Sequence, residues 1–114
     1  MPNYRFTFFD KFKKDYKEAK KKNPELDSDF KDFLDGFDHL AGDIVPSTAG
    51  ARKIRFQKGN QGKSGGYRVY YYFAFEDRVY LLRMFSKNKK SDLSIKEKLE
   101  IAEIIEMIKT VTLP

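Results

Sequence analysis

Three basic residues at alternate positions of two strand-like runs are the part of this sequence best suited to chemistry. Lys53 and Arg55 lie two positions apart in RKIRF, and Arg68 lies in YRVYYYF. Side chains two positions apart on a strand share one face of its sheet. Arginine binds phosphate through two parallel hydrogen bonds, and lysine binds it as a point charge. An exposed face of such residues is suited to a polyanion.

The positive charge of the chain is concentrated around these residues. Residues 51–90 contain eleven Lys and Arg but only two acidic residues, a net charge of +9. Residues 1–50 carry −1 and residues 91–114 carry −2, while the whole chain of 114 residues carries +6. The excess therefore lies entirely on one segment.

Residues 51–90 also carry the pattern of an antiparallel meander of three strands. In the first two runs, apolar residues alternate with basic residues and tyrosines, which predicts one face buried under helices and one open face. The third run, VYLLRMF, divides less cleanly between two faces. The open face is expected to carry a basic and aromatic platform: Lys53, Arg55, Arg68, Tyr70 and Tyr72.

A glycine-rich segment, GNQGKSGG at residues 59–66, joins the first two of these strands. Its backbone amides, with Lys63, can cradle a phosphate, or the segment can be no more than a flexible hairpin loop. It is not a Walker motif, because the spacing differs and no Lys-Ser/Thr pair opens a helix.

The segments on either side of the meander predict one further strand and three helices. The aromatic run Tyr4–Phe9 is typical of a strand, and an amphipathic helix follows from Asp10 to about Lys22. A second helix is expected behind Ser28 as N-cap, with Phe30, Phe33, Leu34 and Phe37 forming an apolar stripe.

The last helix follows a capping-box pattern at residues 94–97 and is expected to run to about Lys109. Gly42–Gly50 is interpreted as a connector. These elements predict a single α+β domain over residues 1–114, in the order β-α-α-β-β-β-α. Its small antiparallel sheet has a mixed edge, two N-terminal helices on one face and a C-terminal helix.

The composition excludes several classes of protein. The chain contains no cysteine and only one histidine, so neither a disulfide nor a thiolate metal site is available, and no cofactor is implied. No apolar run approaches the roughly 20 residues of a membrane span, and the N-terminus lacks a signal-peptide pattern. A soluble cytoplasmic protein without membrane attachment is expected.

The blocks GGYRVYYYF and FSKNKKSDLS, with RKIRF and VYLL, resemble the RelE/ParE superfamily of type II toxins, most closely its RelE-like HigB branch. The resemblance covers Gly50 to about Lys109. It implies a ribosome-dependent endoribonuclease that cleaves mRNA and is held inactive by a cognate antitoxin. For this branch, that antitoxin is usually a helix–turn–helix protein.

The resemblance also implies the site residues. By position, the basic residues of the family fall on Lys53 and Arg55, on Arg68, and on Lys87 or Lys89. Some relatives have a tyrosine near the start of the final segment, but no tyrosine lies near Ser94 here, so the general base is not assigned.

A ribonuclease of this kind needs no metal, because the 2′-OH of RNA attacks the neighbouring phosphate and basic side chains can stabilise the charge that develops. Arg68 is the expected phosphate clamp, Lys53 or Lys87 the proton-transfer group, and Arg55 a charge stabiliser. The expected RNA-binding residues are Lys63, Tyr70, Tyr72, Arg83 and Lys89.

Two other functions remain open on the sequence. A ParE-like toxin that inhibits DNA gyrase would share the fold, although the dense basic cluster favours the ribonuclease. A non-catalytic single-stranded RNA-binding domain is the other alternative, since GGYRVYYYF loosely resembles an RNP1 strand.

Overall fold

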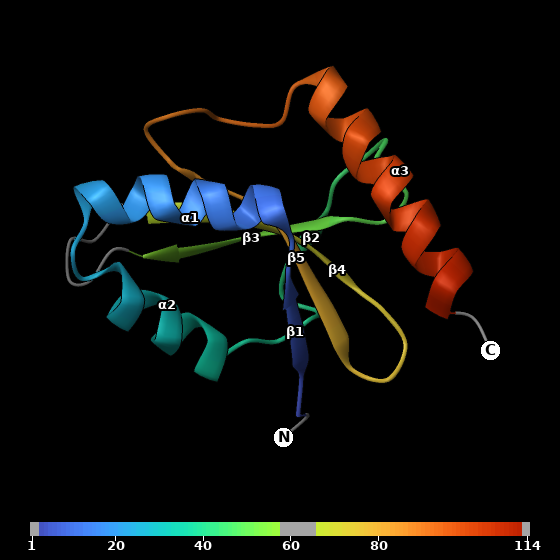
Figure 1. The fold of residues 1–114 in the computed structure, drawn as a ribbon, viewed down its shortest axis with the longest axis horizontal. Helices are drawn as coiled ribbons and strands as arrows, with labels where there is room; N and C mark the ends of the chain where they lie inside the picture. The colour runs from blue at the N-terminus through green and yellow to red at the C-terminus, as the bar shows by residue number, and fades with distance from the viewer. Residues whose placement is uncertain (1–2, 58–65, 113–114) are drawn as a thin grey trace.

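A computed structural model describes residues 3–57 and 66–112, in which three helices pack on a five-stranded sheet (Figure 1). This confirms the predicted α+β class. The elements in chain order are β1 (Arg5–Phe8), α1 (Asp10–Lys22), α2 (Leu26–Asp35), β2 (Asp43–Ile44), β3 (Arg52–Gln57), β4 (Gly66–Phe73), β5 (Arg78–Ser86) and α3 (Ile95–Thr112).

The sheet has the strand order β1-β5-β4-β3-β2, and its β1 edge is the mixed one, because β1 runs parallel to β5 while the other neighbours are antiparallel. The interpretation of Gly42–Gly50 as a connector was wrong in part. Asp43 and Ile44 pair with Lys53 and Arg52 as a two-residue edge strand. A strand of two residues is too short to show the alternation by which strands are predicted.

The helices lie on both faces of the sheet. In Figure 1, α1 and α2 lie together on the left and α3 on the right, with the strands between them. The buried side chains accordingly form two clusters. The first joins Phe12 of α1 and Phe30 of α2 to Val69 and Leu81, and the second joins Ile105 of α3 to other residues of β4 and β5.

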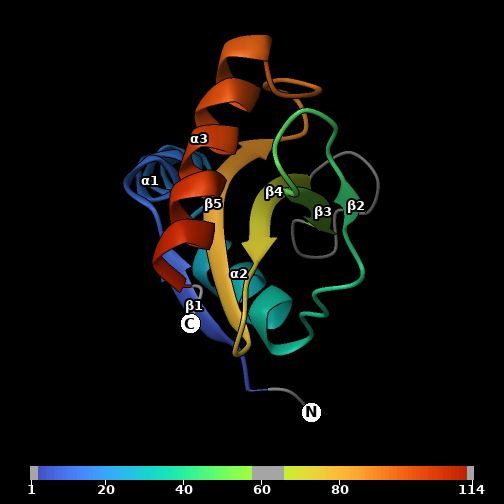
Figure 2. The same cartoon turned by 90° about the vertical axis from the view of Figure 1, so that its right-hand side faces the viewer.

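The expected open face is therefore partly covered. Figure 2 shows α3 running beside β4 and β5, where Ile101 and Ile105 pack against Tyr70, Leu82 and Phe85. The alternation of apolar and polar residues predicts that a strand has two faces, but it does not show how many helices cover them.

The irregular third run has a structural cause. Tyr70 pairs with Arg83 while its neighbour Tyr71 pairs with Leu81, so Leu82 is an extra residue opposite β4. This β-bulge shifts the alternation by one position. As a result Leu82 packs with α3, whereas Met84, two residues on, packs in the cluster under α1 and α2.

The helix ends show which capping patterns were informative. The capping box of α3 is confirmed, because the backbone N–H of Ser94 donates to Glu97 Oε1 at 2.7 Å and the N–H of Glu97 donates to Ser94 Oγ at 3.2 Å. Ser28 is not the N-cap of α2, which begins at Leu26 after Glu25. Asn23 starts this helix early, because its side-chain oxygen accepts a hydrogen bond from the N–H of Glu25 at 3.1 Å.

None of the helices within residues 3–57 and 66–112 is both long and apolar enough to cross a membrane.

Candidate nucleic-acid interface

The strand pairing brings the predicted basic residues of β3 and β4 together. Arg55 lies directly opposite Arg68, and Lys53 lies opposite Tyr70. Opposed residues on antiparallel strands share a face, with their Cβ atoms roughly 5 Å apart. The structure therefore places Lys53, Arg55 and Arg68 side by side on one face of the sheet.

The pairing of Arg55 with Arg68 is unfavourable in the free protein. Like charges directly opposite each other on neighbouring strands destabilise a sheet. Within the described part of the chain, neither arginine nor Lys53 forms an ion pair that would offset this repulsion. A surface that concentrates cations is suited to an anion.

A turn after β5 adds two lysines at the same end of the sheet. The backbone N–H of Lys87 donates to the carbonyl of Gly66, the first residue of β4, at 2.9 Å, and the N–H of Lys89 donates to the carbonyl of Ser86 at 3.1 Å. Both lysine side chains are exposed. We call the surface formed by Lys53, Arg55, Arg68, Lys87 and Lys89 the basic platform.

Lys90 anchors the turn that carries these lysines. Its ammonium group lies 4.7 Å from the ring centroid of Phe85 and 2.5 Å from Glu97 Oε1. Burial raises the pKa of Glu97, but hydrogen bonds from Lys90 and Ser94 outweigh this effect and lower the pKa to about 2. Glu97 is therefore ionised across the physiological range and holds the turn against the start of α3.

Tyr70 does not belong to the accessible surface. Its side chain is fully buried beneath α3, so the prediction that it stacks on a nucleic-acid base was wrong. Its hydroxyl donates to Asp92 Oδ1 at 3.1 Å. Burial and the Asp92 carboxylate raise the pKa of Tyr70 to about 12, although the nearby charge of Arg68 acts in the opposite direction.

Asp92 is a member of the site that sequence reasoning missed. It accepts hydrogen bonds from the Tyr70 hydroxyl and, at 2.8 Å, from the backbone N–H of Leu93. Burial raises the pKa of Asp92, but these hydrogen bonds and the charges of Lys53 and Lys98 outweigh it, so the pKa lies below its ordinary value. One feature of the sequence could have identified Asp92: it is the single acidic residue between Arg78 and Ser94.

Arg83 was predicted to bind RNA, but its side chain is largely buried in an ion-pair network. Its guanidinium group donates to both carboxylate oxygens of Asp15, at 2.8 and 3.1 Å, and lies 3.4 Å from Glu97. Only 16% of its side chain is exposed. Since Asp15 comes from α1, 68 residues away in sequence, a reading of the strand alone cannot find this partner.

Two predicted RNA-binding residues remain, Tyr72 and Lys63, and the structure does not place either of them on the basic platform. Tyr72 shares the α3 side of the sheet and is partly buried against the second core cluster. Four residues along β4 separate it from Arg68, roughly 13 Å at the rise of a strand. Lys63 and the predicted phosphate-cradling loop fall outside the described residues.

The described residues contain no group of three or more His, Asp and Glu side chains placed to hold a metal ion. The single histidine, His39, stacks on Phe73 with ring centroids 3.8 Å apart and is hydrogen-bonded to the hydroxyl of Tyr4. The basic platform consists of lysine and arginine side chains, which can bind phosphate and stabilise negative charge that develops on it.

No known protein-family model matches this chain.

Proposed function

We propose that this protein is the toxin of a type II toxin–antitoxin system, a ribosome-dependent mRNA endoribonuclease that inhibits translation. One observation carries the proposal: Arg55 and Arg68 are directly opposed across two strands, beside Lys53 and the lysine turn after β5. The resemblance of RKIRF, GGYRVYYYF and FSKNKKSDLS to the RelE-like toxins supports the same reading.

In this mechanism the RNA supplies its own nucleophile. The 2′-OH attacks the neighbouring phosphorus, the bond to the 5′ oxygen breaks, and a 2′,3′-cyclic phosphate and a 5′-hydroxyl end form. Arg68 clamps the scissile phosphate, and Arg55 stabilises the charge that accumulates on its oxygens. Lys53 or Lys87 transfers the proton. No step requires a metal ion.

The partners follow from this proposal. The substrate is mRNA presented by the ribosome, and the protein acts in the cytoplasm, where translation occurs. A cognate antitoxin, expected to be a helix–turn–helix protein, would cover the basic platform or compete with RNA for it.

Expression of the wild type and of Arg68→Ala in cells, followed by mapping of mRNA 5′ ends, tests the proposal. Arg78→Ala is the matched control. It removes the same charge at the start of β5, whereas the lysine turn of the basic platform follows the end of that strand. Growth arrest with new mRNA ends is expected for the wild type and for Arg78→Ala, but not for Arg68→Ala.

Other outcomes would point to other functions. Arrest without mRNA cleavage, together with inhibition of DNA supercoiling, would favour the ParE-like gyrase inhibitor. RNA binding with neither arrest nor cleavage would favour a non-catalytic RNA-binding domain.

A further inference from the structure

The outer face of α3 carries a row of exposed apolar residues. Ile95 is 79% exposed, Leu99 57%, Met107 65% and Val111 81%. They occupy positions four apart, except that Glu103 takes the middle place of the row. Neighbours four apart are close on a helix surface but about 40° apart around its axis, so the row forms a ridge that winds around α3.

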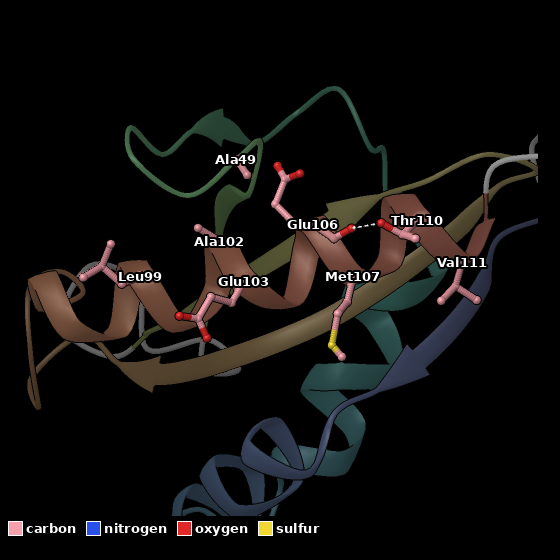
Figure 3. Close-up of a pocket in the computed structure, with 8 residues that line it drawn as sticks. All are labelled: Ala49, Leu99, Ala102, Glu103, Glu106, Met107, Thr110 and Val111. Atoms are coloured by element: carbon pink, nitrogen blue, oxygen red, sulfur yellow. Dashed lines mark hydrogen bonds between the residues drawn. The ribbon is translucent and has the colours of Figure 1, made fainter.

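Leu99, Met107 and Val111 of this ridge line a shallow, open groove with a volume of about 570 Å³. Figure 3 shows Leu99, Met107 and Val111 spread along α3, with Ala49 of the β2–β3 segment facing the helix. The apolar floor is completed by Ala102. Exposed apolar surface that is contiguous and bordered by polar residues is typical of a protein-interaction site.

We propose that this groove docks an amphipathic helix of a partner protein, with apolar anchors flanked by lysine or arginine. The inference does not depend on the proposed ribonuclease function. A helix is the natural occupant of an elongated apolar groove beside another helix, because its side chains at i, i+3, i+4 and i+7 form one apolar strip.

The charge of the groove determines the chemistry of the partner. Its charged lining residues are Glu103 and Glu106, although the chain as a whole carries +6. Among the residues described, Glu103 makes no ion pair, and Glu106 lies 3.5 Å from Lys109, which also donates to the carbonyl of Ala49. Basic side chains beside the apolar anchors would pair with the two glutamates.

The same charges disfavour a second copy of this chain as the occupant. In a two-fold symmetric pair, the same patch is used by both subunits. Because Glu103 lies at the middle of the ridge, either helix direction would bring it close to its symmetry mate. This repulsion adds to that between two chains of charge +6.

Two synthetic helical peptides test the proposal directly. Both carry leucine at anchor positions i, i+4, i+7 and i+11, and the flanking positions are lysine in one and glutamate in the other. Binding to the full chain is measured by fluorescence anisotropy. The lysine peptide is expected to bind about tenfold more tightly than the glutamate peptide, as two exposed ion pairs would provide.

Variants of the groove make the test specific. Glu103→Lys with Glu106→Lys should reverse the preference, and Met107→Ser should weaken both peptides. Asp32→Lys, which changes an exposed acid on α2, is the control and should bind as the wild type does. All of these side chains are exposed, so folding should be retained.

Three results would overturn the proposal. They are equal binding of the two peptides, a preference that is unchanged in the double variant, and wild-type self-association in sedimentation that Met107→Ser abolishes. The last result would assign the groove to a second copy of the chain.

Discussion

At the scale of single residues, the like charges of the basic platform lower the stability of the sheet. Arg55 faces Arg68 across the β3–β4 pair, where like charges repel. Arg55→Gln is therefore expected to raise the free energy of unfolding by about 0.5 kcal/mol while weakening RNA binding. Urea denaturation measures the first effect. The salt dependence of RNA binding measures the second, because removal of one phosphate contact lowers the slope by about 1.

Arg55→Gln must therefore raise stability and weaken RNA binding. A variant that is both less stable and unchanged in RNA binding would show that Arg55 has a structural role. Arg5→Gln, at the other edge of the sheet, is the control, since it breaks an exposed contact with Glu76 and should leave RNA binding unchanged.

Gly42, just before β2, packs closely against Tyr71 and the backbone of Lys53. A Cβ atom at this position would lie 2.5 Å from the hydroxyl oxygen of Tyr71 and 2.9 Å from the carbonyl oxygen of Lys53. The ring of Tyr71 is fully buried and cannot move aside. Gly42→Ala should therefore lower the free energy of unfolding by about 1–3 kcal/mol in thermal or urea denaturation.

Gly36 provides the matched control for this substitution. The nearest atom to a Cβ at Gly36 is the carbonyl oxygen of Asp32, at an ordinary 3.7 Å. Gly36→Ala should leave stability unchanged or slightly raised. Equal losses for the two variants would contradict the packing argument.

Residue types and their alternation were enough to predict Lys53, Arg55 and Arg68 as neighbours on one face. They were not enough for Tyr70 and Arg83, whose partners in the fold decide their roles. The hydrogen bond of Tyr70 to Asp92 spans 22 residues, and that of Arg83 to Asp15 spans 68. No local pattern contains such pairs.

At the scale of elements, the β4–β5 hairpin is held in a turn that its sequence disfavours. Glu76 and Asp77 adopt φ angles of 60° and 59°, the left-handed region, as in a type I′ turn. Glycine takes this conformation without steric cost, so Asp77→Gly should raise the free energy of unfolding by roughly 1 kcal/mol. Thermal denaturation measures the change. Asp77→Ala should lower stability, because alanine tolerates the conformation less well than aspartate.

The start of α3 gives a pH dependence of stability. The pKa of Glu97 is about 2 in the folded chain and 4.5 as a free side chain. Between these values the unfolded state binds more protons, so stability is fully present above about pH 4.5 and is lost as the pH falls toward 2. Glu97→Gln should flatten this part of the stability curve in acid denaturation. An unchanged acid transition would contradict the role given to the Glu97–Lys90 contact.

Strong local signals predicted the elements well. The capping box predicted α3, and the apolar spacing predicted α1 and α2 with small errors at their ends. There are two exceptions. Strand β2 is too short to show a period. Helix α2 begins before Ser28, because the Asn23 side chain accepts a hydrogen bond from the N–H of Glu25.

At the scale of the whole molecule, the α+β class followed from the sequence, but the edge strand β2 and the covering of the sheet did not. Ile101 and Ile105 predict that α3 buries one side, and nothing in their spacing says which sheet face it packs against. Because α3 covers Tyr70, the basic platform lies at the sheet end where β3, β4 and the turn after β5 meet.

The most direct test of the central claim is mRNA cleavage in a reconstituted translation system, with purified protein and ribosomes stalled on a defined mRNA. Fragments with 5′-hydroxyl ends are expected from the wild type and from Arg78→Ala. Arg68→Ala should reduce the rate roughly 10²–10³-fold. Intact mRNA with the wild type, or cleavage at an unchanged rate by Arg68→Ala, would contradict the account.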